Sequence, residues 1–184
     1  MTSTRTRPAP ALGRYQIEAG PAAVTFATRH LFGLGRVRGT LAVSSGTVDV
    51  AEPLAESGME VSIDAASFRT GNAQRDGQVH SAAFLNTQQF PRLIFRAGAV
   101  ADDEPSPGAV VRDAAGRLTV PGSLTVREVT RPVTLLTEFT DIGPRSFTAR
   151  ATTRIDRTEF GITGARGLAA RYLGITVEVT CVRS

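Results

Sequence analysis

The chain has 184 residues, of which 41% are hydrophobic, so it can form one domain with its own apolar core. Its longest apolar run covers residues 82–85, far short of the roughly 20 residues that a membrane-spanning helix needs. The net charge is +4, which is too small for a strong nucleic-acid binder, and the single cysteine, Cys181, excludes an internal disulfide framework and a cysteine-rich zinc site.

The beginning of the chain is rich in Thr, Arg and Pro and shows no apolar periodicity. The sequence therefore predicts a disordered tail over residues 1–13 and a folded domain over residues 14–184. The tail carries two arginines but not the apolar segment that follows them in a secretory signal. We therefore expect a cytoplasmic protein.

Apolar and polar residues then alternate, which is typical of strands with one buried face. The alternation covers residues 22–28, 37–43 and 59–63, and residues 44–46 are expected to form a turn. It returns over residues 93–99, 118–126, 133–139, 147–155 and 173–181. About eight such strands must hide one continuous apolar face. The sequence therefore predicts an all-β fold, a closed antiparallel barrel, with a two-sheet sandwich as the alternative.

One helix is expected between the strands, over residues 73–83, with Asn72 as its N-cap. Gly77 weakens this helix by about 1 kcal/mol relative to alanine. Its apolar face is thin, so we expect a short helical segment that covers one end of the barrel.

Side chains able to do chemistry are few. Asp76 and His80 lie four residues apart on the predicted helix, where the carboxylate can orient the imidazole. A small barrel enzyme, or a haem or metal site that uses His30 or His80, is therefore an alternative, although a helix surface pair and a turn residue are the simpler interpretation. Cys181 falls on an inward strand face, where cysteine behaves as a small apolar side chain. We predict no catalytic residue, metal or cofactor.

A barrel that binds single-stranded nucleic acid is a further alternative. Such barrels place aromatic side chains in a basic groove. Here the outward arginines are not interleaved with aromatic residues, which disfavours this alternative.

Five segments in the right order resemble the YceI family. They are VTFATRHL at 24–31 running on to VRG at 37–39, RDGQVHSAAF at 75–84 followed by FP at 90–91, GSLTV at 122–126 followed by VTRPV at 129–133, RTEFGI at 157–162, and the final strand. Together they span residues 15–182. The chain departs from the family pattern at Pro21 and Gln78, where the family usually has histidine.

The resemblance implies a lipocalin-like barrel that holds a polyisoprenoid chain, such as an isoprenoid quinone or its precursor, for transport, storage or sensing. It implies a lipid-binding protein and not an enzyme, with no nucleic-acid partner, and it makes a homodimer plausible. Small inward residues would leave room for the chain, although in an ordinary core their neighbours fill such space: Ala22, Gly39, Ala97, Ala99, Gly122, Ala149 and Ala151.

The tunnel is expected to run between the barrel and residues 72–86. The residues predicted to form its wall either face inward by strand alternation or lie at the covering helix and turn. They are Val24, Phe26, Leu31, Phe32, Val37, Leu41, Met59, Val61, Phe68, Phe84, Phe95, Leu135, Phe139 and Val177. The head group is expected at the mouth, near Arg29, His30, Arg75 and His80. Because the two family histidines are replaced, we expect a different or weaker head-group contact and an affinity that depends mainly on chain length.

Overall fold

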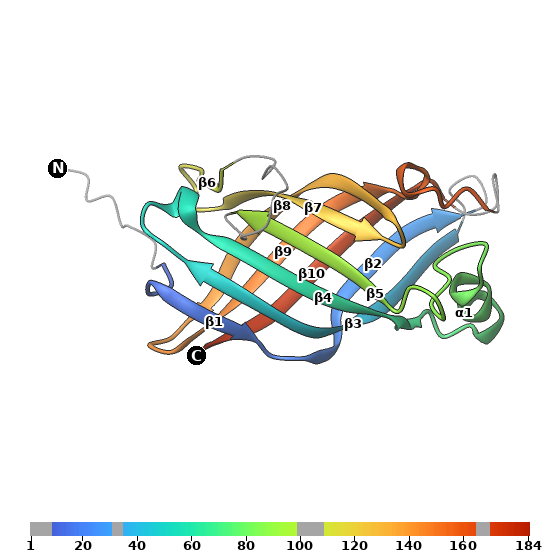
Figure 1. The fold of residues 1–184 in the computed structure, drawn as a ribbon, viewed down its shortest axis with the longest axis horizontal. Coiled ribbons are helices and arrows are strands. Elements are labelled where there is room, and N and C mark those ends of the chain that lie inside the picture. Colours follow the sequence, from blue (N-terminus) through green and yellow to red (C-terminus); the bar gives the residue numbers. More distant parts are fainter. Residues whose placement is uncertain (1–8, 31–34, 99–108, 165–169) are drawn as a thin grey trace.

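The computed structural model describes residues 9–30, 35–98, 109–164 and 170–184 and consists mostly of strands (Figure 1). Their bounds are β1 Gly13–Ile17, β2 Gly20–His30, β3 Gly35–Val50, β4 Gly58–Arg69, β5 Arg92–Gly98, β6 Val111–Arg112, β7 Leu118–Val126, β8 Val129–Ile142, β9 Ser146–Asp156 and β10 Tyr172–Arg183. Among these residues, the α-helix α1 spans Ala73–His80, and the short 3-10 helices η1 and η2 span Leu54–Glu56 and Arg157–Phe160. No helix in the described ranges is long and apolar enough to cross a membrane.

The strands form a closed antiparallel barrel. β2, β3, β4, β5, β7, β8, β9 and β10 pair in that order, and β10 pairs with both β9 and β2, which closes the ring. β1 pairs with β10 and β3, and the short β6 pairs with β7. The expected all-β barrel of about eight strands is confirmed, and closure of the ring excludes the two-sheet sandwich.

Strand alternation decides which side chains face the lumen. On β7, Leu118, Val120 and Leu124 are buried, whereas Thr119 between them is exposed. The turn expected at residues 44–46 is not formed, because β3 continues through this stretch to Val50. Its register with β4 shifts between Val43 and Ser45, so the polar residues form a bulge, which bends a strand without ending it.

α1 covers one end of the barrel (Figure 1). The Asn72 side chain accepts a hydrogen bond from the Arg75 backbone N–H at 2.9 Å, as expected of an N-cap. The helix ends at His80 and not at residue 83, because Ser81 adopts extended backbone and its hydroxyl donates to the Gln78 carbonyl at 2.7 Å. The buried Asp76 carboxylate accepts hydrogen bonds from the backbone N–H and the hydroxyl of Thr70, which fastens the helix to the end of β4.

Candidate ligand-binding cavity

The barrel lumen contains a cavity of about 770 Å³, within the roughly 300–1,000 Å³ that is typical of ligand pockets. We call the barrel end at α1 (residues 73–80) the α1 end, and the end at β1, η1 and β6 (residues 13–17, 54–56 and 111–112) the β1 end (Figure 1). The wall is largely apolar: Ile17, Val24, Leu41, Val48, Val50, Leu54, Met59, Val61, Ile63, Leu93, Phe95, Val110, Leu118, Val120, Leu124, Val133, Leu135, Phe139, Phe147, Ile155, Ile175, Val177 and Val179.

The lumen is hollow because part of its wall is made of small side chains. Ala97, Ala149 and Ala151 line the cavity, and each leaves space that a larger inward residue would fill. A barrel of eight strands is just wide enough for large side chains to fill its interior, so small residues decide whether room for a ligand remains.

Eight of the predicted wall residues line the cavity: Val24, Leu41, Met59, Val61, Phe95, Leu135, Phe139 and Val177. They come from β2, β3, β4, β5, β8 and β10, and the barrel brings them around one lumen. That a ligand contacts them stays a prediction.

Four other predicted wall residues are buried but do not line the cavity: Phe26, Val37, Phe68 and Phe84. The rings of Phe26 and Phe68 stack with their centroids 5.0 Å apart, and the His80 ring meets Phe68 edge-on at 6.1 Å. The Phe26, Phe68 and His80 rings therefore pack in a row beneath the α1 end. Leu31 and Phe32 lie outside the described residues.

Arg75 and His80, the two predicted mouth residues whose side chains the structure describes, are also not part of the cavity lining. Arg75 donates to the Thr70 hydroxyl at 3.3 Å, and His80 packs on Phe68. The side chains of Arg29 and His30 are outside the described part of the structure. The side chains of Arg75 and His80 thus fasten the covering helix to the end of β4, and a head-group contact at the four predicted mouth residues stays a prediction.

The charged side chains that line the cavity lie at the β1 end: Asp49, Glu52, Arg112 and Asp113. The Arg14 guanidinium donates to both carboxylate oxygens of Asp49, at 2.8 and 2.9 Å, and holds the pKa of Asp49 below its ordinary value. Hydrogen bonds from the backbone N–H and the guanidinium of Arg117 likewise hold the pKa of Asp113 below its ordinary value. Sequence reasoning missed this end, because Glu52 and Asp113 lie outside the strands, and Asp49 and Arg112 lie at strand ends where the alternation stops.

Residues 9–12 lie against the cavity at the β1 end, which differs from the expected disordered tail. Ala9, Pro10 and Leu12 are part of the lining, and Pro10 is buried. The buried Tyr15 donates its hydroxyl to the Ala11 carbonyl at 2.7 Å, and Arg183 donates to the Leu12 carbonyl at 2.8 Å. Residues 1–8 are outside the described ranges.

Cys181 lines the cavity from β10 and is 1% exposed. Burial raises the pKa of its thiol to about 12, so the reactive thiolate is scarce near neutral pH. Within the described ranges, no three side chains among His, Cys, Asp and Glu gather in a way that could hold a metal ion.

Thr137 places a hydroxyl in the apolar wall. Its side chain lines the cavity, the residue is 5% exposed, and its Oγ1 has no hydrogen-bond partner among the described residues. A buried hydroxyl without a partner costs about 1–3 kcal/mol, whereas a methyl group of the same shape carries no such penalty.

We therefore expect Thr137→Val to raise the free energy of unfolding of the ligand-free protein by about 1 kcal/mol, as measured by urea denaturation. The control is Thr134→Val at an exposed position of the same strand, which should stay within about 0.5 kcal/mol of the parent. A loss of stability in Thr137→Val would mean that the hydroxyl has a partner in solution.

Comparison with known proteins agrees with this architecture. The sequence model of the YceI-like domain matches residues 15–182. A UPF0312 protein of Enterobacter sp. (strain 638) is 30% identical over 90% of this chain and 83% of its own length. Protein YceI of Escherichia coli O157:H7 is 29% identical over 90% of this chain and 84% of its own length.

Two solved structures share the fold at lower sequence identity. Burkholderia cenocepacia BcnA superposes with a TM-score of 0.71 at 17% identity, covering 89% of this chain and 99% of BcnA. A polyisoprenoid binding domain from Saccharophagus degradans, implicated in plant cell wall breakdown, superposes with a TM-score of 0.68 at 11% identity. The superposition covers 95% of this chain and 100% of that domain. At these identities the likeness shows the fold alone.

Proposed function

Because the chain belongs to the YceI-like domain family, we propose that it binds a polyisoprenoid lipid, such as an isoprenoid quinone or its precursor, inside the barrel. The observation that carries the proposal is the cavity of about 770 Å³, whose wall is formed largely by aliphatic and phenylalanine side chains. A solved domain of the same fold is named as polyisoprenoid-binding, which supports this ligand class. The protein would transport, store or sense the lipid.

Burial of the chain supplies the binding energy. Each prenyl unit has five carbons, and complete burial stabilises it by at most about 4 kcal/mol, at roughly 0.8 kcal/mol per methylene. Several units would offset the loss of translational freedom and the ordering of a flexible chain. Affinity should therefore rise with chain length until the cavity is full.

The proposal assigns no catalytic step to the cavity. The lining includes one thiol, that of Cys181, and its raised pKa of about 12 opposes attack by a thiolate near neutral pH. The Thr137 hydroxyl, which has no partner among the described residues, is better suited to accept or donate one hydrogen bond to a polar group of the lipid.

Prenyl alcohols of increasing length test the proposal, with displacement of a fluorescent prenyl probe as the measurement. We expect binding to tighten by about tenfold or more per added unit and then to reach a plateau. Replacement of the alcohol by a quinone at fixed chain length should change affinity less than one prenyl unit does. Equal binding of short and long chains would contradict the proposal.

A pair of variants on β9 sharpens this test. Ala149 lines the cavity, whereas Arg150 is exposed on the outer face of the same strand. Ala149→Leu should fill part of the lumen, so the plateau should occur at a shorter prenyl chain. Arg150→Leu should leave the plateau where it is in the parent. Identical chain-length profiles for the two variants would show that the prenyl chain binds outside the lumen.

A further inference from the structure

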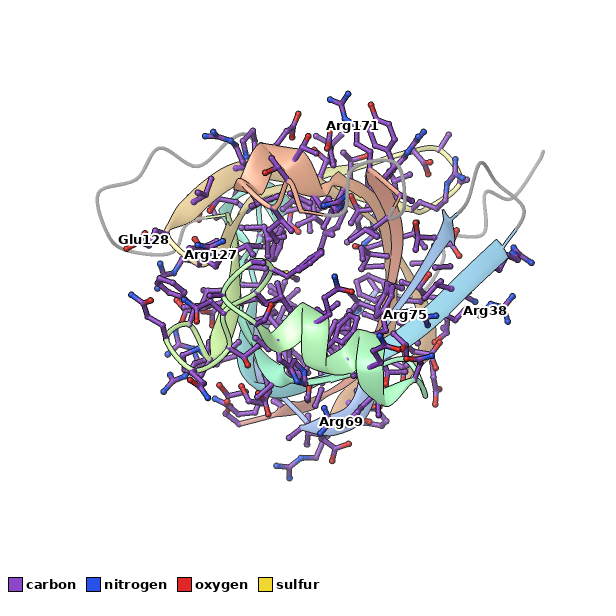
Figure 2. All side chains as sticks on the ribbon, turned by 90° about the vertical axis from the view of Figure 1, so that its right-hand side faces the viewer. Arg38, Arg69, Arg75, Arg127, Glu128 and Arg171 are labelled. Atoms are coloured by element: carbon purple, nitrogen blue, oxygen red, sulfur yellow. The ribbon has the colours of Figure 1, made fainter. Side chains whose placement is uncertain are left out.

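Arginine side chains surround the α1 end of the barrel. We call six of them the basic rim: Arg38, Arg69, Arg75, Arg92, Arg127 and Arg171. Figure 2, which faces this end, shows that the five labelled arginines are distributed around the barrel, with Arg171 and Arg69 on opposite sides. The exposed acidic side chains described at this end are Glu128 and Glu159, and the half-buried Asp64 lies opposite Arg92 in the register of β4 and β5.

Most guanidinium groups of the rim are not neutralised by a carboxylate. Arg69 donates to the Phe68 carbonyl at 2.7 Å, and Arg127 donates to the Phe84 carbonyl at 3.2 Å. Among the described residues, the rim arginine that forms a salt bridge is Arg171, with Asp156 at 2.6 Å. Hydrogen bonds to neutral carbonyls orient the side chains and leave their positive charge uncompensated.

The β1 end is built differently. Two of its arginines are neutralised by carboxylates, Arg14 by Asp49 at 2.8 Å and Arg117 by Asp113 at 2.9 Å. Glu52 adds an exposed negative charge beside the cavity. Arg112, Arg145 and Arg183 also lie at the β1 end, where the exposed Glu52, Glu56 and Asp141 offset their charge. The excess of positive charge is therefore greater at the α1 end, and the molecule carries a charge asymmetry along the barrel axis.

The shape of the rim points to a partner with an extended surface. Arginines on opposite sides of a barrel end cannot all contact one small anion, but they can all face a plane of negative charge. Tyr172, which is 44% exposed, lies at the same end, and the Arg154 and Arg171 guanidinium carbons lie 4.1 and 5.3 Å from its ring centroid. An exposed tyrosine flanked by arginines is typical of the interface between a bilayer and water.

We propose that the basic rim docks the α1 end of the barrel onto a bilayer that contains anionic phospholipid. Each arginine near such a surface strengthens binding by electrostatic attraction that salt screens within about 8 Å at physiological ionic strength. The attraction requires no ligand in the cavity. It is therefore independent of which lipid the cavity holds, and it would bring a lipid-binding barrel to a source of lipid.

Sedimentation with vesicles tests the docking. The full chain should bind vesicles of phosphatidylcholine with phosphatidylglycerol, should not bind vesicles of phosphatidylcholine alone, and should dissociate as salt is raised. The variant Arg38→Gln/Arg92→Gln removes two exposed rim charges for which the described residues offer no hydrogen-bond partner. It should lower the partition coefficient by about fivefold per arginine.

The matched control is Arg145→Gln/Arg150→Gln, which removes the same charge from exposed positions outside the rim. It should lower the partition coefficient much less, and both variants should melt at the temperature of the parent. Equal losses in the two variants would overturn the proposal, because net charge alone would then explain the binding. Tighter binding of a short DNA duplex than of the anionic vesicles would also overturn it and would assign the rim to nucleic acid.

Prenyl-alcohol binding without vesicles separates this proposal from the proposed function. Arg38→Gln/Arg92→Gln should keep the affinity of the parent for the alcohol, because neither residue lines the cavity. Loss of vesicle binding with an unchanged prenyl affinity supports both proposals. Failure of prenyl binding in the parent, with intact vesicle docking, would overturn the proposed function and leave the docking supported.

Discussion

Val177→Arg should unfold the barrel or empty its cavity, whereas Glu178→Arg should do neither. The two residues are neighbours on β10, but Val177 lines the cavity and Glu178 is exposed on the outer face. A charge placed on this apolar wall loses its hydration, and the acidic residues of the lining, Asp49, Glu52 and Asp113, lie at the β1 end. An unpaired buried charge of this kind destabilises a protein by about 3–5 kcal/mol, a large share of the roughly 5–15 kcal/mol that holds a domain folded.

Thermal melting and retention of a bound prenyl probe measure this difference. Val177→Arg should lose most of the probe even if it remains folded, because the long side chain occupies the lumen. Glu178→Arg should melt within a few degrees of the parent and retain the probe. Equal damage from both substitutions would mean that the register of β10 is not the one described. A folded Val177→Arg with full retention would place the lipid outside the barrel.

The contrast on β10 could be predicted from the sequence, because successive side chains of a strand point to opposite faces. The same rule selected Val24, Leu41 and Leu135, and all three line the cavity. Strand alternation decides whether a side chain faces inward or outward, but not how far along the barrel axis it lies. Phe26 shares the inward parity of Val24 on β2, yet its ring stacks on the Phe68 ring beneath α1 and does not line the cavity.

Other parts of the cavity are formed by residues that lie outside the alternating apolar and polar pattern of the sequence. The charged end of the cavity is formed by residues near turns, such as Glu52 and Asp113, and turn residues follow no strand alternation. The place of Pro10 at the cavity depends on hydrogen bonds that Tyr15 and Arg183 make to neighbouring carbonyls. The Arg183 contact joins residues 171 positions apart in the chain, so it requires the folded barrel and cannot be inferred from local composition.

Two glycines of the barrel wall are expected to be irreplaceable, because aromatic rings lie over them. A Cβ at Gly122 would lie 2.5 Å from the Arg96 carbonyl oxygen and would overlap the Phe95 ring. A Cβ at Gly39 would lie 2.5 Å from the Arg69 carbonyl oxygen and would overlap the Phe26 ring. Aromatic cover of a strand glycine is a known way to build a curved sheet.

Gly122→Val should therefore lower the free energy of unfolding by about 3 kcal/mol, because the new side chain must displace both a ring and a backbone carbonyl. Urea denaturation measures the loss. The control is Gly77→Ala in α1, where a Cβ would meet no atom within 4 Å and should stabilise the protein by about 0.5–1 kcal/mol. Phe95→Leu combined with Gly122→Val should recover part of the loss, because the ring that blocks the site is removed. If Gly122→Val is as stable as the parent, the Phe95 ring does not cover Gly122 in solution.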